Sequence, residues 1–458
     1  MPNSQPEHQP ESQAGLVRRI GIVSATALVV SNMIGTGIFT TTGFLAGDLG
    51  SPAMVILIWV VGGAIALAGA LCYVELALNF PRSGGEYVYL SEAWGPSWGF
   101  INGWISFFAG FSAPIAAAAL AMSAYLGLSD GGRLVPLGLL TLHLGDAQLV
   151  ACAVVAMFTL LNVLGVRDVG RLQTALTVLK LLIIGGLLVL GFSVGQGDPG
   201  HLSLATERTS DLSLFEQFAI SLVFVFFAYS GWNAATYVAG EIQRPERTLP
   251  VALFIGTAGV TTLYVALNAL YVYAVPLEDL KGVIAVGAAV ASALFGAEAG
   301  RLFSLALAIS LLATINAMCF VGPRVYYAMA TDGAFFSIAA RIHPKWNSPW
   351  VAVVMQGICA LLLIVLPTFR DLVVYIGFTL YLFTALSVLG LFKLRRRPGW
   401  KKFSWLSRSY PLIPLLYVAM SGWVLVFSIK AAPVASGMSL ATVIAGALAW
   451  HLKKMRQR

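Results

Sequence analysis

Two glycines flank a threonine, Gly35-Thr36-Gly37, in the middle of the first long charge-free segment of the chain, residues 21–45. A helix that crosses a membrane would ordinarily carry Leu, Val and Ala at such positions. Glycine has the poorest helix propensity of the non-proline residues, so the pattern predicts an interrupted helix. In hydrocarbon, an opened backbone is tolerated only where protein or a polar cavity satisfies its N–H and C=O groups. The interruption therefore predicts a place where a solute could bind.

A second glycine beside a hydroxyl residue, Ser230-Gly231, lies in the middle of the apolar segment 214–239. Aromatic residues surround it, and Asn233 follows. Counted along the apolar segments, the two interruptions fall in the first helix and in the sixth. Paired interruptions at matching positions of two halves are typical of inverted repeats that bind a solute between them. Five helices separate the two copies, so the second would enter the membrane from the opposite side.

Lys180 is the charged residue that the membrane would tolerate least. It lies about ten residues from Arg171 and fourteen from Val194, roughly 15 and 20 Å along a helix. A lysine stem reaches only roughly 6 Å toward water. An ionisable residue at such depth normally faces a protein interior, an ion path or a ligand. We favour a coupling or conformational role; the alternative is a structural lysine bonded to backbone carbonyls.

Three more charged residues lie near the predicted inner ends of helices: Glu75, Glu241 and Arg324. Glu75 is either a gate or proton site or, as we favour, an interfacial carboxylate that pairs with Arg82 or another inner-loop base. The mixed-charge link 241–250 is most simply a solvated turn, and an inner gate network is the alternative. Arg324 is expected to lie near the inner surface, where it could pair with Glu75 or Glu241.

The elements that must position these residues are long apolar helices. The 458-residue chain is 58% hydrophobic and only 10% charged, which is far too apolar for an ordinary soluble domain. A spanning helix needs about 20 apolar residues. Segments of this kind occur at 21–45, 53–79, 98–127, 147–165, 171–194, 214–239, 250–275, 302–330, 351–368, 372–392, 411–429 and 434–452. The sequence therefore predicts an all-α integral membrane protein with twelve transmembrane helices.

The predicted organisation places two five-helix repeats before two extra helices. The repeats would occupy 20–195 and 212–393, and helices 11 and 12 would occupy 410–453. A disordered tail at 1–19, a basic loop at 394–409 and a short tail at 454–458 complete the chain. The 16-residue run 282–297 is too short to span and is expected to form a surface or re-entrant element.

The net charge of +8 is distributed in a way that argues for membrane topology rather than for nucleic acid binding. Most of the 28 Lys and Arg residues fall on one predicted side, and the densest group is the loop 394–409. The positive-inside rule makes that side cytoplasmic, together with both termini. We expect a multi-pass protein of a prokaryotic inner or plasma membrane, whose basic loop contacts anionic lipid.

The sequence provides no cluster for catalysis or metal binding. Its four cysteines fall inside predicted helices, and its five histidines fall in tails, in loops or, for His451, at the very end of the last predicted helix. Neither set has the spacing of metal ligands. We therefore expect no cofactor, no metal and no enzymatic activity.

Several motifs in order resemble the amino acid-polyamine-organocation superfamily, and especially its L-type amino acid transporter branch. They include Gly35-Thr36-Gly37-Ile38-Phe39, Pro81-Arg82-Ser83-Gly84-Gly85-Glu86-Tyr87, Phe227-Ala228-Tyr229-Ser230-Gly231-Trp232, Gly240-Glu241-Ile242-Gln243-Arg244-Pro245-Glu246-Arg247 and Arg324-Val325-Tyr326-Tyr327-Ala328-Met329-Ala330. The resemblance implies the leucine-transporter fold, with an inverted 5+5 repeat and broken helices 1 and 6.

The resemblance also implies an amino acid site. Backbone N–H groups and the hydroxyl at Gly35-Thr36-Gly37 would hold the α-carboxylate, and exposed carbonyls would receive the α-ammonium. Phe227 matches an aromatic gate, and Lys180 matches a lysine that in sodium-independent relatives replaces a sodium ion. The predicted substrate-binding set is Met33, Ile34, Gly35, Thr36, Gly37, Phe227, Ala228, Ser230 and Gly231.

We therefore predict a sodium-independent secondary transporter of neutral amino acids that works by alternating access. A transporter of cationic amino acids or polyamines is the main alternative, and a membrane-embedded enzyme, receptor or channel is disfavoured. Proton symport and exchange both stay open, as does the oligomeric state. Segment 128–148 lacks the external cysteine that joins human L-type members to a glycoprotein, so no disulfide-linked heavy subunit is expected.

Overall fold

Most of the chain forms long apolar helices in a computed structural model. The structure describes residues 20–81, 84–128, 132–137, 140–164, 169–331, 333, 335–346 and 348–456. The predicted tail 1–19 and Arg82, one expected partner of Glu75, lie outside these residues. Within the described ranges, nine helices are long and apolar enough to cross a membrane, and four further apolar helices are shorter.

Each of the twelve predicted segments coincides with a helix or with consecutive helical pieces. In the first half these are α1 (Ile22–Met33) with α2 (Gly37–Thr40) and α3 (Thr42–Leu49), then α4 (Pro52–Asn79), then α6 (Pro96–Ile105) with the π-helix η1 (Ser106–Ser112) and α7 (Ala113–Tyr125), then α8 (Asp146–Val163) and α9 (Val169–Ser193).

The second half continues with α10 (Leu214–Tyr229) and the one-turn helix α11 (Ala234–Tyr237). It then has α12 (Pro245–Ala274), α15 (Ala297–Thr331), α16 (Trp350–Val365), α17 (Phe369–Leu394), α19 (Leu412–Ala431) and α20 (Pro433–Arg456). The prediction of an all-α membrane protein with breaks in helices 1 and 6 is confirmed. The exact division into repeats at 20–195 and 212–393 stays a prediction.

Shorter elements cover the two ends of the helices. They are α5 (Glu86–Trp94), α13 (Leu277–Leu280), α14 (Val286–Phe295), α18 (Ser404–Ser409) and the 3-10 turns η2 (Pro199–Ser203), η3 (Ala239–Glu241) and η4 (Ser337–Ala340). The run 282–297 thus contains the short helix α14, which packs against α15. Strands β1 (Arg133–Leu137) and β2 (Leu140–Leu144) form an antiparallel hairpin in which Val135 pairs with Leu142.

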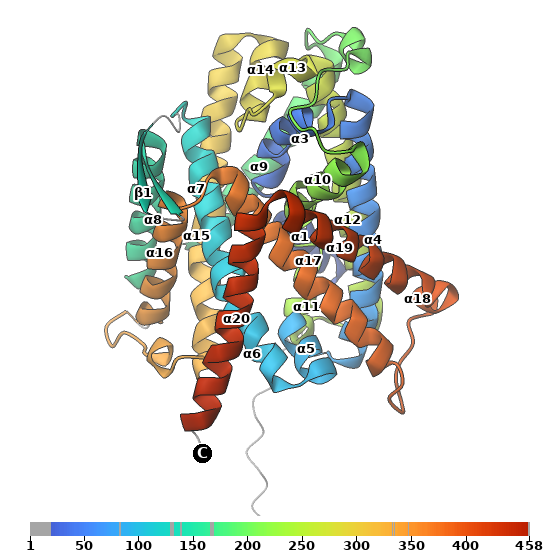
Figure 1. The fold of residues 1–458 in the computed structure, drawn as a ribbon, viewed down its shortest axis with the longest axis vertical. Coiled ribbons are helices and arrows are strands. Elements are labelled where there is room, and N and C mark those ends of the chain that lie inside the picture. Colours follow the sequence, from blue (N-terminus) through green and yellow to red (C-terminus); the bar gives the residue numbers. More distant parts are fainter. Residues whose placement is uncertain are drawn as a thin grey trace, which may run out of the picture.

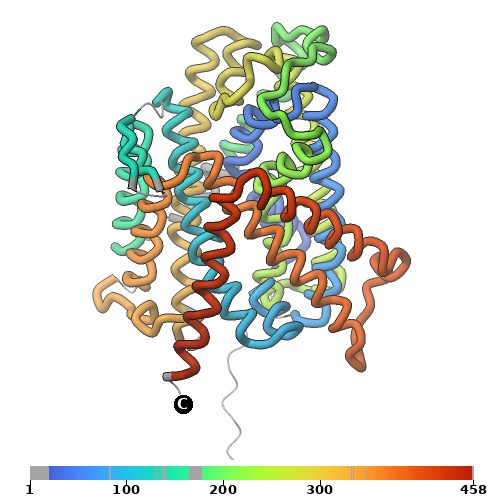
Figure 2. Tube along the Cα trace, in the orientation of Figure 1, coloured from blue at the N-terminus to red at the C-terminus, as the bar shows by residue number. Residues whose placement is uncertain are grey.

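The two ends of the molecule are easily told apart in Figure 1. One end carries α13, α14 and the C-terminal end of α3, and the opposite end carries α5, α6 and the end of α20. They are called the α14 end and the α5 end below. Figure 2 shows the last helix, in red, running toward the α5 end, and α20 packs against both α6 and α17.

Small residues bring the central helices close together. A Cβ atom at Gly63 of α4 would lie 2.3 Å from the Thr261 side chain of α12, and one at Gly256 of α12 would lie 2.8 Å from Val29 of α1. Such contacts drive helix association in lipid, where apolar side chains gain little from leaving the solvent. Helices α1, α4 and α12 therefore form a tightly packed group around the break in helix 1.

Candidate functional site

The break in helix 1 leaves backbone donors without partners. Helix α1 ends at Met33, α2 begins at Gly37, and the residues between them are not helical. Within the part of the chain that the structure describes, the N–H groups of Gly35, Thr36 and Gly37 donate to no backbone carbonyl. Unpaired N–H groups at the start of a helix attract an anion, as does the positive end of the helix dipole.

The break in helix 6 depends on Gly231. Helix α10 ends at Tyr229, and Gly231 has φ +99°, a conformation that favours glycine. A Cβ atom there would lie 2.8 Å from the carbonyl carbon and oxygen of Asn32 in α1. At the other side of the contact, a Cβ atom at Gly37 would lie 2.4 Å from the Cα of Ala228. The two breaks therefore touch each other, and each requires a glycine at the contact.

The carbonyl groups at the breaks have partners inside the protein. The Tyr264 hydroxyl of α12 lies 2.6 Å from the Met33 oxygen and 3.1 Å from the Ala228 oxygen, so it bridges both broken helices. The Ser230 hydroxyl donates to the Phe227 oxygen at 2.7 Å. We expected these carbonyls to be open. The Phe227 oxygen also accepts from the Ser230 N–H at 3.2 Å. Because a carbonyl oxygen has two lone pairs, those of Met33 and Ala228 can each still accept a further donor.

Lys180 joins α9 to the break in helix 1. Its Nζ donates to the carbonyl oxygen of Ile34 at 2.5 Å, and the residue is only 6% exposed. Ile34 follows the end of α1 directly, so its oxygen is one of the acceptors that the interruption frees. The contact places Lys180 at the break. A carbonyl partner is what the structural alternative describes, and a coupling or conformational role stays a prediction.

The comparisons with known proteins agree with this geometry. A family model described as "Amino acid permease" matches residues 20–448. The chain belongs to the amino acid permease family. It is 29% identical over 447 residues to the serine/threonine exchanger SteT of Bacillus subtilis, covering 97% of this chain and 98% of that protein.

Human and mouse relatives match this permease over nearly the same length. The chain is 31% identical over 457 residues to the human large neutral amino acids transporter small subunit 2, which covers 97% of this chain and 82% of that protein. It is 29% identical over 441 residues to the mouse Asc-type amino acid transporter 1, covering 95% and 81% respectively. The family identifies the permease as a multi-pass membrane protein.

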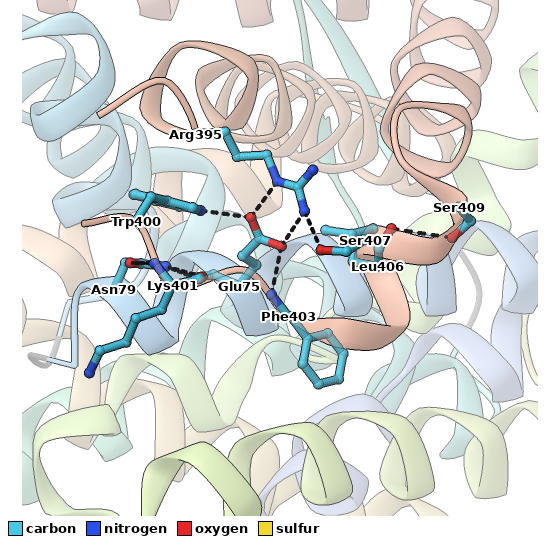
Figure 3. A network of polar contacts seen from close by, with 9 residues as sticks. All are labelled: Glu75, Asn79, Arg395, Trp400, Lys401, Phe403, Leu406, Ser407 and Ser409. Atoms are coloured by element: carbon cyan, nitrogen blue, oxygen red, sulfur yellow. Dashed lines mark hydrogen bonds and ion pairs between the residues drawn. The ribbon is translucent and has the colours of Figure 1, made fainter. Parts of the chain in front are cut away.

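Glu75 of the permease belongs to a buried anchor (Figure 3). Its carboxylate accepts from Arg395 Nε at 2.5 Å, from Trp400 Nε1 at 2.7 Å and from the Phe403 N–H at 3.0 Å. The pair with a base of the basic loop agrees with the interpretation that we favoured, although the base is Arg395. The anchor ties α4 to the chain between α17 and α19. Glu75 therefore has the contacts of a structural residue rather than of a gate.

Among the described residues, Arg324 pairs with neither Glu75 nor Glu241, the two partners that we considered for it. Its guanidinium lies 3.3 Å from the centre of the Phe320 ring and donates to the Phe320 oxygen, one turn back in α15. The contact with the Phe320 ring gives the Arg324 guanidinium a favourable partner within its own helix. Glu75 already forms an ion pair with Arg395.

Glu241 contributes through its backbone. Its oxygen accepts from the Ile20 N–H at 3.0 Å, and Gln243 donates to the Ile20 oxygen at 2.9 Å. This short bridge ties the start of helix 1 to the link after helix 6 at the α5 end. A gating role for the Glu241 side chain stays a prediction, as does the role of Phe227, which is 5% exposed.

Some cations of the basic loop, together with Lys393 at the end of α17, have partners within the protein. Lys393 donates to the Ala93 oxygen at 2.7 Å, and Arg397 pairs with Glu92 at 3.0 Å. With Arg395 on Glu75, these contacts direct cations of the loop toward α4 and α5. Lys401 is exposed, and in Figure 3 its side chain extends away from Glu75.

Sequence reasoning missed a buried carboxyl at the α5 end. Glu86 of α5 is 5% exposed. It accepts from the amide of Asn233, which directly precedes α11, and from the hydroxyl of Tyr237, the last residue of α11. Burial raises the pKa of Glu86 above its ordinary value of 4.5, although these hydrogen bonds act to lower it. Glu86 stood inside a motif that we used, but its partner is 147 residues away, and no local pattern indicates such a contact.

Proposed function

We propose that this permease is a sodium-independent secondary transporter of neutral L-amino acids that works by alternating access. The observation that carries the proposal is the direct contact of two broken helices. The break in helix 1 supplies free N–H groups and the Met33 carbonyl, and the break in helix 6 adds the Ala228 carbonyl. A zwitterion carries the complementary pair of charges on two groups of one α-carbon.

The polarity of the site follows from the direction of the helices. The N–H groups of Gly35, Thr36 and Gly37 lie at the positive start of α2 and would hold the α-carboxylate. The carbonyls of Met33 and Ala228 would accept from the α-ammonium. Both already accept from Tyr264, so a substrate would share them with, or take them from, its hydroxyl.

The absence of acidic side chains in the predicted set favours neutral substrates. Met33, Ile34 and Phe227 surround the breaks with apolar groups, and Thr36 and Ser230 add hydroxyls. A cationic amino acid or polyamine would bring a second positive charge that none of these side chains could balance. The names of the relatives, which refer to serine, threonine and large neutral amino acids, support the same class.

Lys180 supports independence from sodium. Its ammonium already supplies a positive charge at the carbonyl of Ile34, where a free cation would otherwise be attracted. A sodium ion placed beside it would be repelled in a site of low dielectric constant. In one conformation the ammonium would link α9, the fifth membrane helix, to the break in helix 1, and in another conformation this link would be absent.

The charge distribution supports a cytoplasmic α5 end and an extracellular α14 end, with both termini inside. We also propose that the permease works without a disulfide-linked heavy subunit. Segment 128–148 has no cysteine, and Cys152 lies within α8, where it is not in an external loop.

Exchange in proteoliposomes tests the function. Vesicles loaded with unlabelled amino acids should take up labelled neutral amino acids saturably, and at the same rate in sodium and in choline buffer. The variants Gly37→Ala and Gly231→Ala should lose uptake, because each added Cβ would meet backbone of the other broken helix. Gly259→Ala is the matched control, since nothing lies within 4 Å of the new atom. Absence of saturable uptake for every amino acid tested would refute the proposal.

A further inference from the structure

Glu86 of α5 is a buried carboxyl group without a cation. Two other carboxylates are comparably buried within the described ranges, Asp48 of α3 and Glu75 of α4. Arg370 of α17 lies 2.9 Å from Asp48, and Arg395 lies 2.5 Å from Glu75. In the same part of the chain, no lysine, arginine or histidine pairs with Glu86. Since burial disfavours a charge that has no counter-charge, Glu86 is the one of the three whose neutral form is favoured most.

The groups that face the Glu86 carboxyl are an amide and phenols. Asn233 donates to Oε1, and Tyr237 donates to Oε2. Three further phenol groups lie around the carboxyl, those of Tyr73, Tyr89 and Tyr417. The hydroxyls of Tyr73 and Tyr89 are buried and have no hydrogen-bond partner among the described residues. A protonated carboxyl has one O–H group to donate, and these hydroxyl oxygens supply acceptors near it.

The cations that approach α5 do so at its far end. Lys393 of α17 donates to the Ala93 oxygen, and Arg397 pairs with Glu92. Glu92 and Ala93 lie six and seven residues beyond Glu86, or roughly 10 Å along the helix. Helix α6, which also packs against α5, has no titratable residue. The proton equilibrium of Glu86 is therefore governed by burial and by neutral hydrogen-bond donors.

Glu86 joins α5 to the part of helix 6 that follows its break (Figure 1). Asn233 lies two residues beyond Gly231 and directly precedes α11. A Cβ atom at Gly85 would lie 2.6 Å from the ring of Tyr237, the last residue of α11. Helix α11 packs in turn against α1, the first piece of helix 1. The carboxyl therefore lies where pieces of both broken helices can be held or released together.

Solvent reaches the side chain that covers Glu86 at the α5 end. Tyr237 is 43% exposed, whereas Glu86, to which its hydroxyl donates, is 5% exposed. Movement of this one side chain would open a path for protons. Burial raises the pKa of Glu86 above its ordinary value. The proton is therefore bound more tightly while α5 and α11 are in contact than after they separate.

We propose that Glu86 is a proton-binding site of the permease, and that the bound proton holds α11, the part of helix 6 after its break, against α5. Loss of the proton favours separation of the two helices, because the ionised carboxylate then gains water. Transport at the α5 end would depend on pH for this reason. For that role in transport the inference rests on the proposed function, whereas the binding of the proton does not.

Thiol labelling of the purified permease in detergent tests the site. Thr236→Cys places a thiol in α11, at a position that is 0% exposed. Its labelling rate, corrected for the four native cysteines, measures how often α11 leaves α5. At each pH the rate is divided by that of the same protein with Glu86→Gln, which cancels the pH dependence of the thiol itself. We expect this ratio to increase about tenfold between pH 5 and pH 8, because ionisation of Glu86 favours separation.

Two further variants make the test specific. Glu246→Gln removes an exposed carboxyl at the start of α12, at the same end of the molecule, and should leave the pH profile of the Thr236→Cys protein unchanged. Tyr237→Phe removes a donor that favours the ionised carboxylate, so the midpoint of the profile should move to higher pH. This shift tests the site even if Glu86→Gln does not fold.

The outcomes separate the proton site from the proposed function. A ratio that is the same at pH 5 and at pH 8, or a midpoint that Tyr237→Phe does not move, would overturn the proton site whether or not the protein exchanges amino acids. A pH-dependent ratio in a protein that exchanges no amino acid would refute the proposed function and leave the proton site intact.

Discussion

Two buried carboxyl groups contact the broken helices at opposite ends of the molecule, and their partners differ in kind. Asp48 at the α14 end has a cation, Arg370, one of whose guanidinium nitrogens contacts both carboxylate oxygens. Glu86 at the α5 end accepts from an amide and a phenol, Asn233 and Tyr237. Burial raises the pKa of both carboxyl groups, but only Asp48 has a cation that opposes the rise, whereas Glu86 has hydrogen-bond donors alone. A carboxyl group can therefore serve a charge-based contact at one end of a transporter and a hydrogen-bonded contact at the other.

The largest effect on stability should come from replacing a third buried carboxylate, Glu75, which accepts from both a cation and neutral donors. Glu75→Gln leaves Arg395, whose side chain is 8% exposed, without its counter-charge. We expect the folded state to lose about 3–5 kcal/mol, as is typical when one partner of a buried pair is removed. Thermal unfolding in detergent measures the loss.

The matched control for Glu75 is Glu92→Gln, which removes a pair whose side chains are 45% and 28% exposed. That change should cost less than about 1 kcal/mol. If the two variants lost the same free energy of unfolding, burial would not determine how much an ion pair stabilises this protein.

Much of the site could be predicted from the sequence because its signals are local. A glycine pair at Gly35 and Gly37 weakens a helix wherever it lies, and Lys180 is too deep to reach water in any helix of that length. The partners of Asp48 and Glu86 could not be predicted in the same way. Arg370 is 322 residues from Asp48, and only the packed arrangement of helices brings them together.

Tyr264 illustrates the same limit. A tyrosine in an apolar helix has no distinguishing pattern, and its hydroxyl becomes significant only because two carbonyl groups from separate breaks meet beside it. The partner of Glu75 could not be predicted for the same reason, since several bases were predicted near Glu75 and geometry alone selects Arg395.

A smaller effect, on transport rather than on stability, should distinguish the two interpretations of Lys180. Lys180→Ala removes the charged hydrogen bond to Ile34 and should slow exchange about tenfold or more, as loss of a bond worth roughly 1.5–3 kcal/mol would. Membrane insertion and monodispersity should be unchanged. Kinetics that match the wild type at every pH would instead support a purely structural lysine.

The smallest effect should appear in the pH dependence of stability. Burial raises the pKa of Glu86 in the folded protein. Its contribution to stability is therefore greatest below its ordinary value of 4.5 and is lost as pH rises through the folded-state pKa. Glu86→Gln removes this dependence, so the stability of the variant relative to wild type should increase between pH 5 and pH 8, as thermal unfolding at the two pH values would measure.

The same pair of pH values sharpens the comparison between the two ends. Asp48→Asn removes a carboxylate that is already paired with a cation, so it should destabilise the protein at both pH values. We therefore expect the effect of Glu86→Gln on the unfolding midpoint to change more between pH 5 and pH 8 than the effect of Asp48→Asn. The same change for both variants would show that the kind of partner does not affect how the stability depends on pH.

The account depends most on the claim that two broken helices hold both charges of one amino acid. Competition against a transported amino acid in proteoliposomes tests it, with the amino acid, its methyl ester and its N-acetyl derivative as competitors. We predict that the intact zwitterion competes and that each derivative is weaker by about a hundredfold, since each loses one charge-assisted contact. Competition by the ester or the N-acetyl derivative as strong as that of the parent amino acid would contradict the account.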